Sequence, residues 1–225
     1  MENLKMGDER ITFERLEALP DGATKDLAKQ LFEVGDAWTI VPAVRCATTT
    51  AWRPNAQFML IDGDLEVEGN VVVATGSHDH GALIVLGSLR CQQLITGHGQ
   101  NLVVTGDLVA NDAIIAELAD STTHVGGMVL TDTLLSGRGA WVSLASADGF
   151  KAKHCSAYVM VGNSPLKPAA AASTVARLVD DVLDRDEWDS MDEEDRQGED
   201  IDDLIMLDEV AALRHVAEGR GLLRG

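Results

Sequence analysis

The sequence predicts a mainly β protein: a right-handed parallel β-solenoid of about 20-residue coils, with an N-terminal capping helix and C-terminal acidic helices. Two observations lead to this prediction. One short phrase recurs through the middle of the chain, as Met59–Leu65, Leu83–Leu89, Leu102–Leu108 and, more loosely, Thr122–Met128. An aliphatic pair follows each copy, namely Val71-Val72, Leu94-Ile95, Ile114-Ile115 and Leu134-Leu135. A fixed period of this size indicates stacked, similar coils.

Apolar side chains alternate within each copy, which is typical of strands, and helical periodicity is absent here. In the second copy we expect Leu83 and Val85 to point inward and Ile84 and Leu86 to point outward. The connections between parallel strands are expected to be right-handed. A glycine occupies the same slot in each copy, as Gly87 does, where the chain bends or closely approaches its neighbour.

We expect three regions along the chain. Residues 1–35 form an N-terminal cap with a short helix, residues 36–164 form the solenoid, and residues 165–225 form a linker and an acidic helical region. The short helix spans 24–34, with Thr24 as its N-cap and Gly35 at its end. We expect this helix to cover the first coil, because an open solenoid end exposes an unpaired strand edge.

The C-terminal region is expected to begin with a linker over 165–172. An amphipathic helix then starts at Ser173, and residues 184–200 form a mobile acidic loop. A final helix spans 201–218 and ends before Gly219. Its broad apolar face docks either on the C-terminal end of the solenoid, which we favour, or on another chain.

Charge narrows the class of partner. The 225 residues include 37 acidic and 18 basic side chains, so the net charge is −19. Residues 172–225 carry 17 of the acidic and 6 of the basic side chains, a net charge of −11. Such a surface repels nucleic acid phosphates and anionic lipids, and it attracts basic proteins. We expect a basic protein partner and neither nucleic acid nor membrane binding; the oligomeric state stays open.

Cysteine usage and hydropathy predict a cytoplasmic protein. The first residues are charged and lack the apolar stretch of a signal peptide, and no apolar run approaches the roughly 18 residues of a membrane span. Cys46, Cys91 and Cys155 lie far apart and form no CxxC pair. We therefore expect reduced thiols, with no disulfide framework and no zinc site.

The histidines are weak candidates for a metal site. His78 and His80 flank Asp79, and His98 follows about one coil later. Loops of unequal length leave their register uncertain, so surface histidines without a metal are favoured. His124 allows two alignments: on Gly126 it points inward, and on Gly127 it points outward. We favour the outward position, facing solvent, because a buried histidine needs a partner.

Enzyme motifs are absent from the sequence, including GxGxxG, the P-loop, GxSxG and HExxH. Outward carboxylates do occur, but the basic residues that a polysaccharide-cleaving cleft would place beside them are scarce. We therefore expect a non-enzyme with no catalytic residue, no cofactor and no metal. The outward carboxylates are Asp62, Asp64, Glu66, Glu68, Asp107 and Asp112.

The repeated phrase, two hydrophobic residues, any residue, then Gly-Asp-Leu and an aliphatic pair, resembles the coils of bactofilins, which are polymer-forming bacterial cytoskeletal β-helices. It is also similar to bacterial β-solenoid proteins associated with toxin and immunity gene neighbourhoods. The resemblance covers residues 57–145. Bactofilins polymerise end to end through uncapped coils, so the resemblance implies a scaffold. This chain departs from them in the helix before the solenoid and the acidic helices after it.

The leading hypothesis is a non-enzymatic acidic binding protein, specifically an immunity protein that neutralises a basic secreted toxin by protein–protein binding. Carboxylates would occupy the phosphate-binding surface of the toxin, and Trp188 would supply an apolar anchor. The alternative is a bactofilin-like, polymer-forming structural scaffold. The expected partner-binding residues are Asp186, Glu187, Trp188, Asp189, Asp192, Glu193, Glu194 and Asp195.

Overall fold

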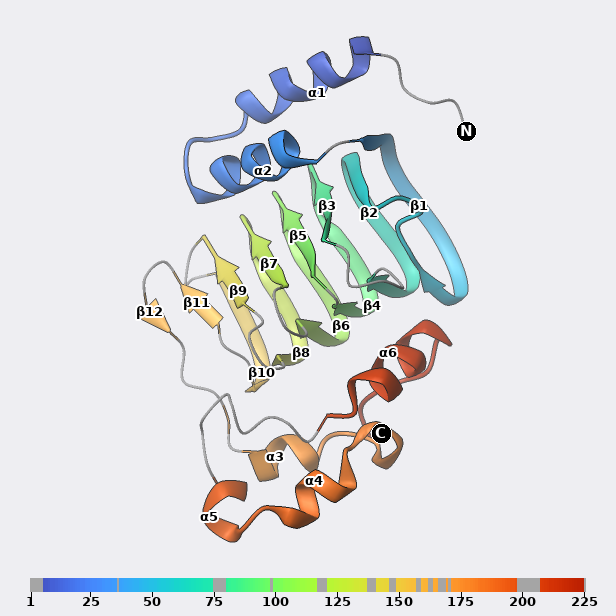
Figure 1. The fold of residues 1–225 in the computed structure, drawn as a ribbon, viewed down its shortest axis with the longest axis vertical. Coiled ribbons are helices and arrows are strands. Elements are labelled where there is room, and N and C mark those ends of the chain that lie inside the picture. The colour runs from blue at the N-terminus through green and yellow to red at the C-terminus, as the bar shows by residue number, and fades with distance from the viewer. Residues whose placement is uncertain are drawn as a thin grey trace.

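The chain forms a parallel β-solenoid of about 5 turns, with helices packed on two sides of it (Figure 1). This is the fold class that the repeats predict. The structure is a computed structural model. It describes residues 6–35, 37–74, 80–97, 99–116, 121–136, 141–145, 149–156, 159–161, 164–165, 169, 171–197 and 207–224.

The elements are helices at the two chain ends and strands between them. The helices are α1 (Met6–Glu17), α2 (Ala23–Val34), α3 (Ala171–Val175), α4 (Arg185–Ser190), α5 (Glu193–Arg196) and α6 (Glu209–Ala217), with a 3₁₀ turn at Asp180–Val182. The long first strands are β1 (Trp38–Trp52) and β2 (Phe58–Val73). The others are β3 (Gly81–Val85), β4 (Leu89–Thr96), β5 (Gln100–Val104), β6 (Leu108–Ala116), β7 (Thr122–Val125), β8 (Val129–Ser136), β9 (Trp141–Leu144), β10 (Phe150–Ser156), β11 (Val159–Val161) and β12 (Ser164–Pro165).

The strands lie in two parallel rows that meet at β2. One row runs β2-β3-β5-β7-β9-β11, and the other runs β2-β4-β6-β8-β10. Equivalent residues of the repeat face each other across neighbouring strands: Leu83 pairs with both Met59 and Leu102, and Ile114 pairs with both Leu94 and Leu134. Each repeated phrase therefore stacks directly on the preceding copy.

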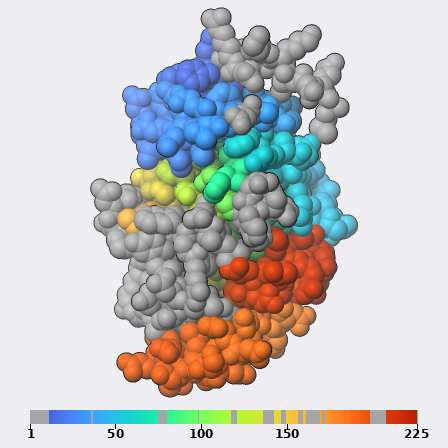
Figure 2. Space-filling view, viewed as in Figure 1, coloured from blue at the N-terminus to red at the C-terminus, as the bar shows by residue number. Residues whose placement is uncertain are grey.

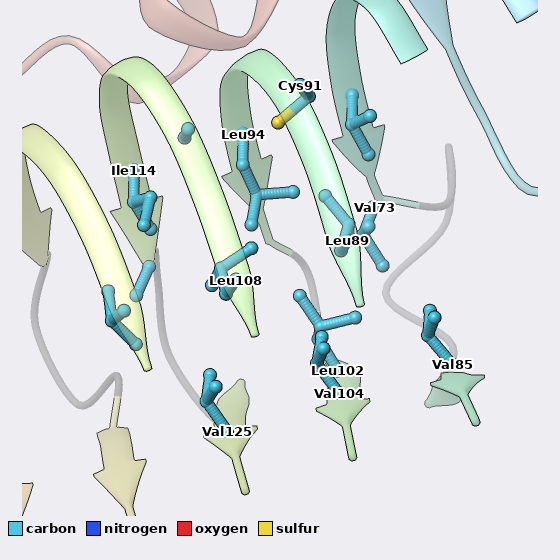
Figure 3. Close-up of a cluster of buried hydrophobic side chains, with 14 of the residues drawn as sticks. Val73, Val85, Leu89, Cys91, Leu94, Leu102, Val104, Leu108, Ile114 and Val125 are labelled. Atoms are coloured by element: carbon cyan, nitrogen blue, oxygen red, sulfur yellow. The ribbon is translucent and has the colours of Figure 1, made fainter. Parts of the chain in front are cut away.

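The interior consists of the side chains that alternation predicts to point inward (Figure 3). Leu83 and Val85 have no exposed surface. Full burial of each such side chain contributes about 1.5–3 kcal/mol relative to its exposed state. The interior rows are Ile61, Val85, Val104, Val125 and Leu144 on one side and Val71, Leu94, Ile114 and Leu134 on the other.

Outward aliphatic side chains bind the two helical layers. On the β3 row, Leu60, Ile84 and Val103 pack under Leu16 of α1 and Ala28 of α2. On the β4 row, the second residue of each aliphatic pair packs under the C-terminal region, residues 171–224. This second row is Val72, Ile95, Ile115 and Leu135, and it contacts Val175, Leu178, Val182, Ala212, Val216 and Leu222.

The N-terminal helix therefore has a wider role than covering the first coil. It forms over 23–34, but its N-cap is Gly22 and not Thr24 as the sequence suggests, because the Thr24 hydroxyl instead bonds His124 four coils later. Near the other end of the helix, the Phe32 carbonyl accepts a hydrogen bond from the Trp38 indole N–H at 3.0 Å. The helix lies along the side of the solenoid because outward aliphatics continue through successive coils. The far edge of β1 pairs with no other strand that the structure describes.

A column of glycines explains the recurring glycine slot in the repeat. The amide N–H of Gly106 donates to the carbonyl of Gly87, and that of Gly127 donates to Gly106, at 2.8 and 2.9 Å. A Cβ built on Gly106 would lie 2.9 Å from the carbonyl carbon of Gly87. Only glycine allows this close approach of successive turns.

The C-terminal region differs from the expectation in three ways. The helix that begins near Ser173 stops at Val175, and a 3₁₀ turn follows at 180–182. The expected loop over 184–200 contains the short helices α4 and α5. The final helix begins at Glu209, and residues 201–206 lie outside the described residues. Half of the expected linker, 166–168 and 170, also lies outside them.

The last helix docks within the chain, but not on the C-terminal end of the solenoid. α6 lies against β1, β2 and β4, the N-terminal coils. Gly219, whose φ is 78°, ends it as the sequence predicts. Across the described residues, no helix is both long and apolar enough to cross a membrane.

Candidate functional site

The expected partner-binding residues lie in one short segment, residues 184–197, which we call the acidic arm. Two aspartates cap the short helices of this segment. The Asp184 carboxylate accepts the Glu187 N–H at 3.0 Å and begins α4, and the Asp192 carboxylate accepts the Asp195 N–H at 2.9 Å and begins α5. Side-chain acceptors at these positions satisfy amides that a helix leaves without partners. The local sequence thus orders a segment that composition alone marks as a loop.

Carboxylates of the acidic arm face solvent. The arm lies at the end of the molecule opposite α1 and α2 (Figure 2). Its cations, Arg185 and Arg196, are engaged elsewhere: Arg185 pairs with Asp180, and Arg196 binds backbone carbonyls. None of the expected carboxylates pairs with a lysine or arginine of the described chain. The exposed ones are Asp186, Asp189, Asp192, Glu193, Glu194 and Asp195, and Glu187 is half-buried.

Trp188 has a different position from the exposed anchor that the sequence suggests. It is half-buried and packs on the apolar cluster between the C-terminal region and the solenoid. The Arg196 guanidinium lies over its ring at 5.0 Å and donates to its carbonyl oxygen at 3.1 Å. Trp188 therefore fastens the acidic arm to the body of the protein, and the carboxylates on both sides of it remain exposed.

Two buried amides attach the C-terminal region to the solenoid. The Asn70 side chain donates to the Val216 carbonyl at 2.9 Å. The Gln93 side chain donates to the Arg220 carbonyl and accepts the Leu222 N–H, both at 3.1 Å. Both side chains are 2% exposed. Both side chains bind backbone atoms, and these bonds fix the position of residues 216–222 along the solenoid.

Sequence reasoning missed this row of polar residues, although a signal for it exists. Asn70, Gln93 and Thr133 each stand directly before an aliphatic pair, at the equivalent slot of their coils. Thr133 completes the row, because its hydroxyl accepts a hydrogen bond from Arg177 Nε at 3.1 Å. A polar residue repeated beside an outward aliphatic residue indicates a covered surface whose cover has backbone groups to satisfy.

An ion cluster lies farther along the same face. Asp132 pairs with Arg177 and, at 2.6 Å, with Lys153. The hydrogen bond from Lys153 is the main cause that holds the pKa of Asp132 below its usual range, and Thr133 and Arg177 add to it. These three residues, with Arg224, line a cavity of about 660 Å³. Arg224 pairs with Asp180 at 2.9 Å, so each cation of the cluster already has a carboxylate partner within the chain.

A second cavity, of about 680 Å³, lies on the outer face of β1, β2, β4 and β6. Arg45 and Glu66 on its wall pair at 2.9 Å, and Glu68 and Arg90 are exposed beside them. Three of the other outward carboxylates have structural partners. Asp62 pairs with Arg15 of α1, and Asp64 and Asp107 accept backbone N–H groups of the next coil.

Two of the three histidines considered for a metal, His78 and His98, lie outside the described residues. His80 is exposed at the start of β3. Within the described ranges, no group of three histidine, cysteine or carboxylate side chains could hold a metal ion.

His124 points outward, as the alignment on Gly127 predicts, since its neighbour Val125 lies in the interior row. The expectation that it faces solvent is wrong. It is 2% exposed because α2 covers it, and its Nε2 lies 2.8 Å from the Thr24 hydroxyl. Burial lowers the pKa of His124.

Comparisons with protein-family models, with curated proteins and with solved structures find no match for this chain. The resemblance to bactofilins and to immunity-associated solenoids therefore extends to the β-solenoid architecture alone.

Proposed function

We propose that this protein is a non-catalytic binding protein that presents the acidic arm to a basic protein partner. The supporting observation is the arm itself: carboxylates without cationic partners in the described chain, on two helices whose N-termini are capped by Asp184 and Asp192. A preorganised charged surface loses little conformational entropy on binding. In the most specific form of the proposal, the protein is a cytoplasmic immunity protein and the partner is a basic secreted toxin.

The mechanism is occupation of a cationic surface. A toxin that cleaves nucleic acid holds phosphates with lysines and arginines, and the carboxylates of the arm would take the place of those phosphates. In this mechanism the role of Trp188 is to hold the arm on the body of the protein. Exposed charges of this kind raise the association rate chiefly, and salt screens them. Binding should therefore weaken strongly as the salt concentration rises.

A matched pair of charge variants tests the proposal. Asp186→Asn, Asp189→Asn and Glu194→Gln together remove three charges from the arm and keep both capping aspartates. Asp26→Asn, Glu33→Gln and Glu68→Gln remove three charges elsewhere. We would coexpress each variant with a basic toxin domain encoded in a neighbouring reading frame and measure cell survival. We expect the arm variant to lose protection and the control to keep it. Full protection by the arm variant would reject the arm mechanism.

The free edge of β1 favours a second function, a polymer-forming scaffold. The inward side chains Val41, Val44 and Trp52 are only half-buried, whereas their partners in β2 are at most 5% exposed. The segment 38–52 contains Arg45 and no acidic residue, so two acidic chains would repel each other least here. Such an unpaired edge can add a strand from another molecule.

Electron microscopy and light scattering of the purified protein distinguish the two functions. Filaments that disappear when Ala47→Lys places a charge on the exposed part of β1 would support the scaffold. A monomer at all concentrations would count against the scaffold and leave the binding proposal intact. The two proposals therefore fail independently.

A further inference from the structure

The two helical layers are fastened to the solenoid by the same pair of residue types. On one side, His124 of β7 lies with Nε2 2.8 Å from the hydroxyl of Thr24 in α2. On the other side, His154 of β10 lies with Nε2 3.0 Å from the hydroxyl of Thr174 in α3. In each pair the histidine belongs to the solenoid and the threonine belongs to the covering helix. The covering helices α2 and α3 lie on opposite sides of the solenoid (Figure 1).

Both contacts suit a neutral imidazole. A neutral ring has one N–H and one lone pair, and a threonine hydroxyl can donate or accept, so either tautomer satisfies the bond. An imidazolium donates from both nitrogens, and its charge is costly where water has little access. Access is limited at both contacts, because His124 is 2% exposed and the half-buried His154 lies against Thr174, which is 3% exposed.

Charges near His124 do not offset its burial. Its strand neighbours are Val103 in β5 and Ser143 in β9. On the covering helix, Lys25 and Asp26 follow Thr24 in the sequence. The Lys25 ammonium group pairs with the Asp21 carboxylate at 2.9 Å. Burial is the cause of the lowered pKa of His124.

His154 has charged neighbours on both elements that pack against it. Its strand neighbour is Thr133 of β8, next to Asp132, and Arg177 follows α3. Burial is the main cause of the lowered pKa of His154; the Arg177 guanidinium adds to the effect and the Asp132 carboxylate opposes it. Lys153 and Arg177 both bind Asp132, which weakens that opposition.

Each covering layer hides a continuous apolar surface. Opening the N-terminal layer would uncover Leu60, Ile84 and Val103, and opening the C-terminal layer would uncover Ile95 and Ile115. Layers of this kind open locally while the rest of a protein stays folded. The histidine–threonine contact contributes to the stability of its layer, so a proton taken up in the open form shifts the opening equilibrium.

We propose that protonation of His124 and His154 releases the helix pair α1–α2 and the C-terminal region from the solenoid, so that the protein opens in acid. An exposed histidine titrates near pH 6.5. In the open form the imidazole takes up a proton near that pH, whereas in the closed form it stays neutral to a lower pH. The closed form therefore loses stability as the pH falls through this window. The inference does not depend on the function of the acidic arm.

Hydrogen exchange followed by mass spectrometry tests the proposal on the full-length chain. Protection factors, corrected for the intrinsic effect of pH, would be compared at about pH 7.5 and about pH 5.5, on either side of the titration of an exposed histidine. The peptides of interest are 23–34 in α2 and 171–178 around α3. In the wild type we expect protection of both peptides to fall at the lower pH by up to about tenfold, the limit for one histidine that takes up a proton only in the open form.

Three variants separate the two contacts. His124→Gln keeps a hydrogen-bonding amide beside Thr24 but cannot be protonated, so the pH dependence of α2 should disappear while that of α3 remains. His154→Gln should give the converse. His80→Gln, at an exposed position, should behave like the wild type. Equal protection of both peptides at the two pH values in the wild type would overturn the proposal, and so would unchanged pH dependence in His124→Gln.

A titration of the wild-type imidazole signals by NMR provides a second measurement if a variant does not fold. We expect His124 and His154 to titrate below about pH 6.5, the midpoint of a freely exposed histidine. A midpoint for His124 at or above that value would overturn the proposal.

Discussion

The Asp64 carboxylate accepts a hydrogen bond from the backbone N–H of Ser88, the residue at the equivalent position one coil later, at 2.7 Å. The relationship repeats along the solenoid. The Ser88 hydroxyl accepts the Asp107 N–H at 3.1 Å, and the Asp107 carboxylate accepts the Met128 N–H at 2.9 Å. Backbone donors at the corner would otherwise lack partners within the stack. The Gly-Asp phrase of the repeat therefore has a structural purpose, which removes these aspartates from the candidate ligands of a partner.

Loss of one of these hydrogen bonds between successive coils should destabilise the protein. In Asp107→Ala the Met128 N–H loses its acceptor, which should lower the free energy of unfolding by about 1 kcal/mol at this partly exposed site. Asp107→Asn keeps a carbonyl acceptor and should lose less. Glu68→Ala, which removes an exposed carboxylate two coils earlier, serves as the control. Urea denaturation measures all three, and equal stability of Asp107→Ala and the control would contradict the structural role.

The glycine column makes a second stability prediction. In Gly106→Ala the new Cβ would lie 2.7 Å from the Ser88 hydroxyl and 2.9 Å from the backbone of Gly87, so the coils must move apart. We expect a loss of about 1–3 kcal/mol, typical of overpacking. Gly221→Ala is the matched control, because nothing lies within 4 Å of the position that its new methyl group would take. Thermal unfolding followed by circular dichroism should separate the two variants clearly.

The solenoid was predictable because its information is local and repeated. Alternation assigns Leu83 and Val85 to the interior, and register carries the same assignment to every coil. α1 was not predicted, because its apolar residues form no clear stripe and its stability depends on contacts made far along the chain. Leu16 packs against the solenoid, and Arg15 pairs with Asp62. Such contacts leave no periodic signal.

The sequence predicts the cluster of charge in the acidic arm, but it does not predict that the arm forms helices. Composition locates Asp186 to Asp195 but does not show that Asp184 and Asp192 cap helices. The position of Trp188 depends on Arg196 and on an apolar cluster assembled from distant residues. The same limit applies to His124: alternation gives its outward direction, and only the packing of α2 explains its burial.

The Gln93 side chain should contribute more to the free energy of unfolding than that of its neighbour Gln92. Gln93→Leu keeps the volume but leaves the Arg220 carbonyl and the Leu222 N–H without their side-chain partner. The loss should cost about 1–3 kcal/mol for the buried Leu222 N–H and less for the partly buried Arg220 carbonyl. The Gln92 side chain accepts a hydrogen bond from the exposed Asn111 side chain at 3.1 Å. Gln92→Leu should therefore change the free energy of unfolding by about 0.5 kcal/mol or less. Urea denaturation compares them. Limited proteolysis would show whether residues 216–224 become accessible first in Gln93→Leu.

Cys91 should be the least reactive thiol of the protein. It is 5% exposed, inside the solenoid, and burial raises the pKa of its thiol far above the usual range. The thiolate is the nucleophile, so burial lowers both its concentration and its access to a reagent. Cys46 is half-buried in β1, the coil with a free edge, and should react sooner. Iodoacetamide labelling followed by mass spectrometry should modify Cys46 in the native protein and Cys91 only after denaturation. Equal native rates for the two would show that the interior of the solenoid opens on the timescale of labelling, in conflict with a closely packed stack.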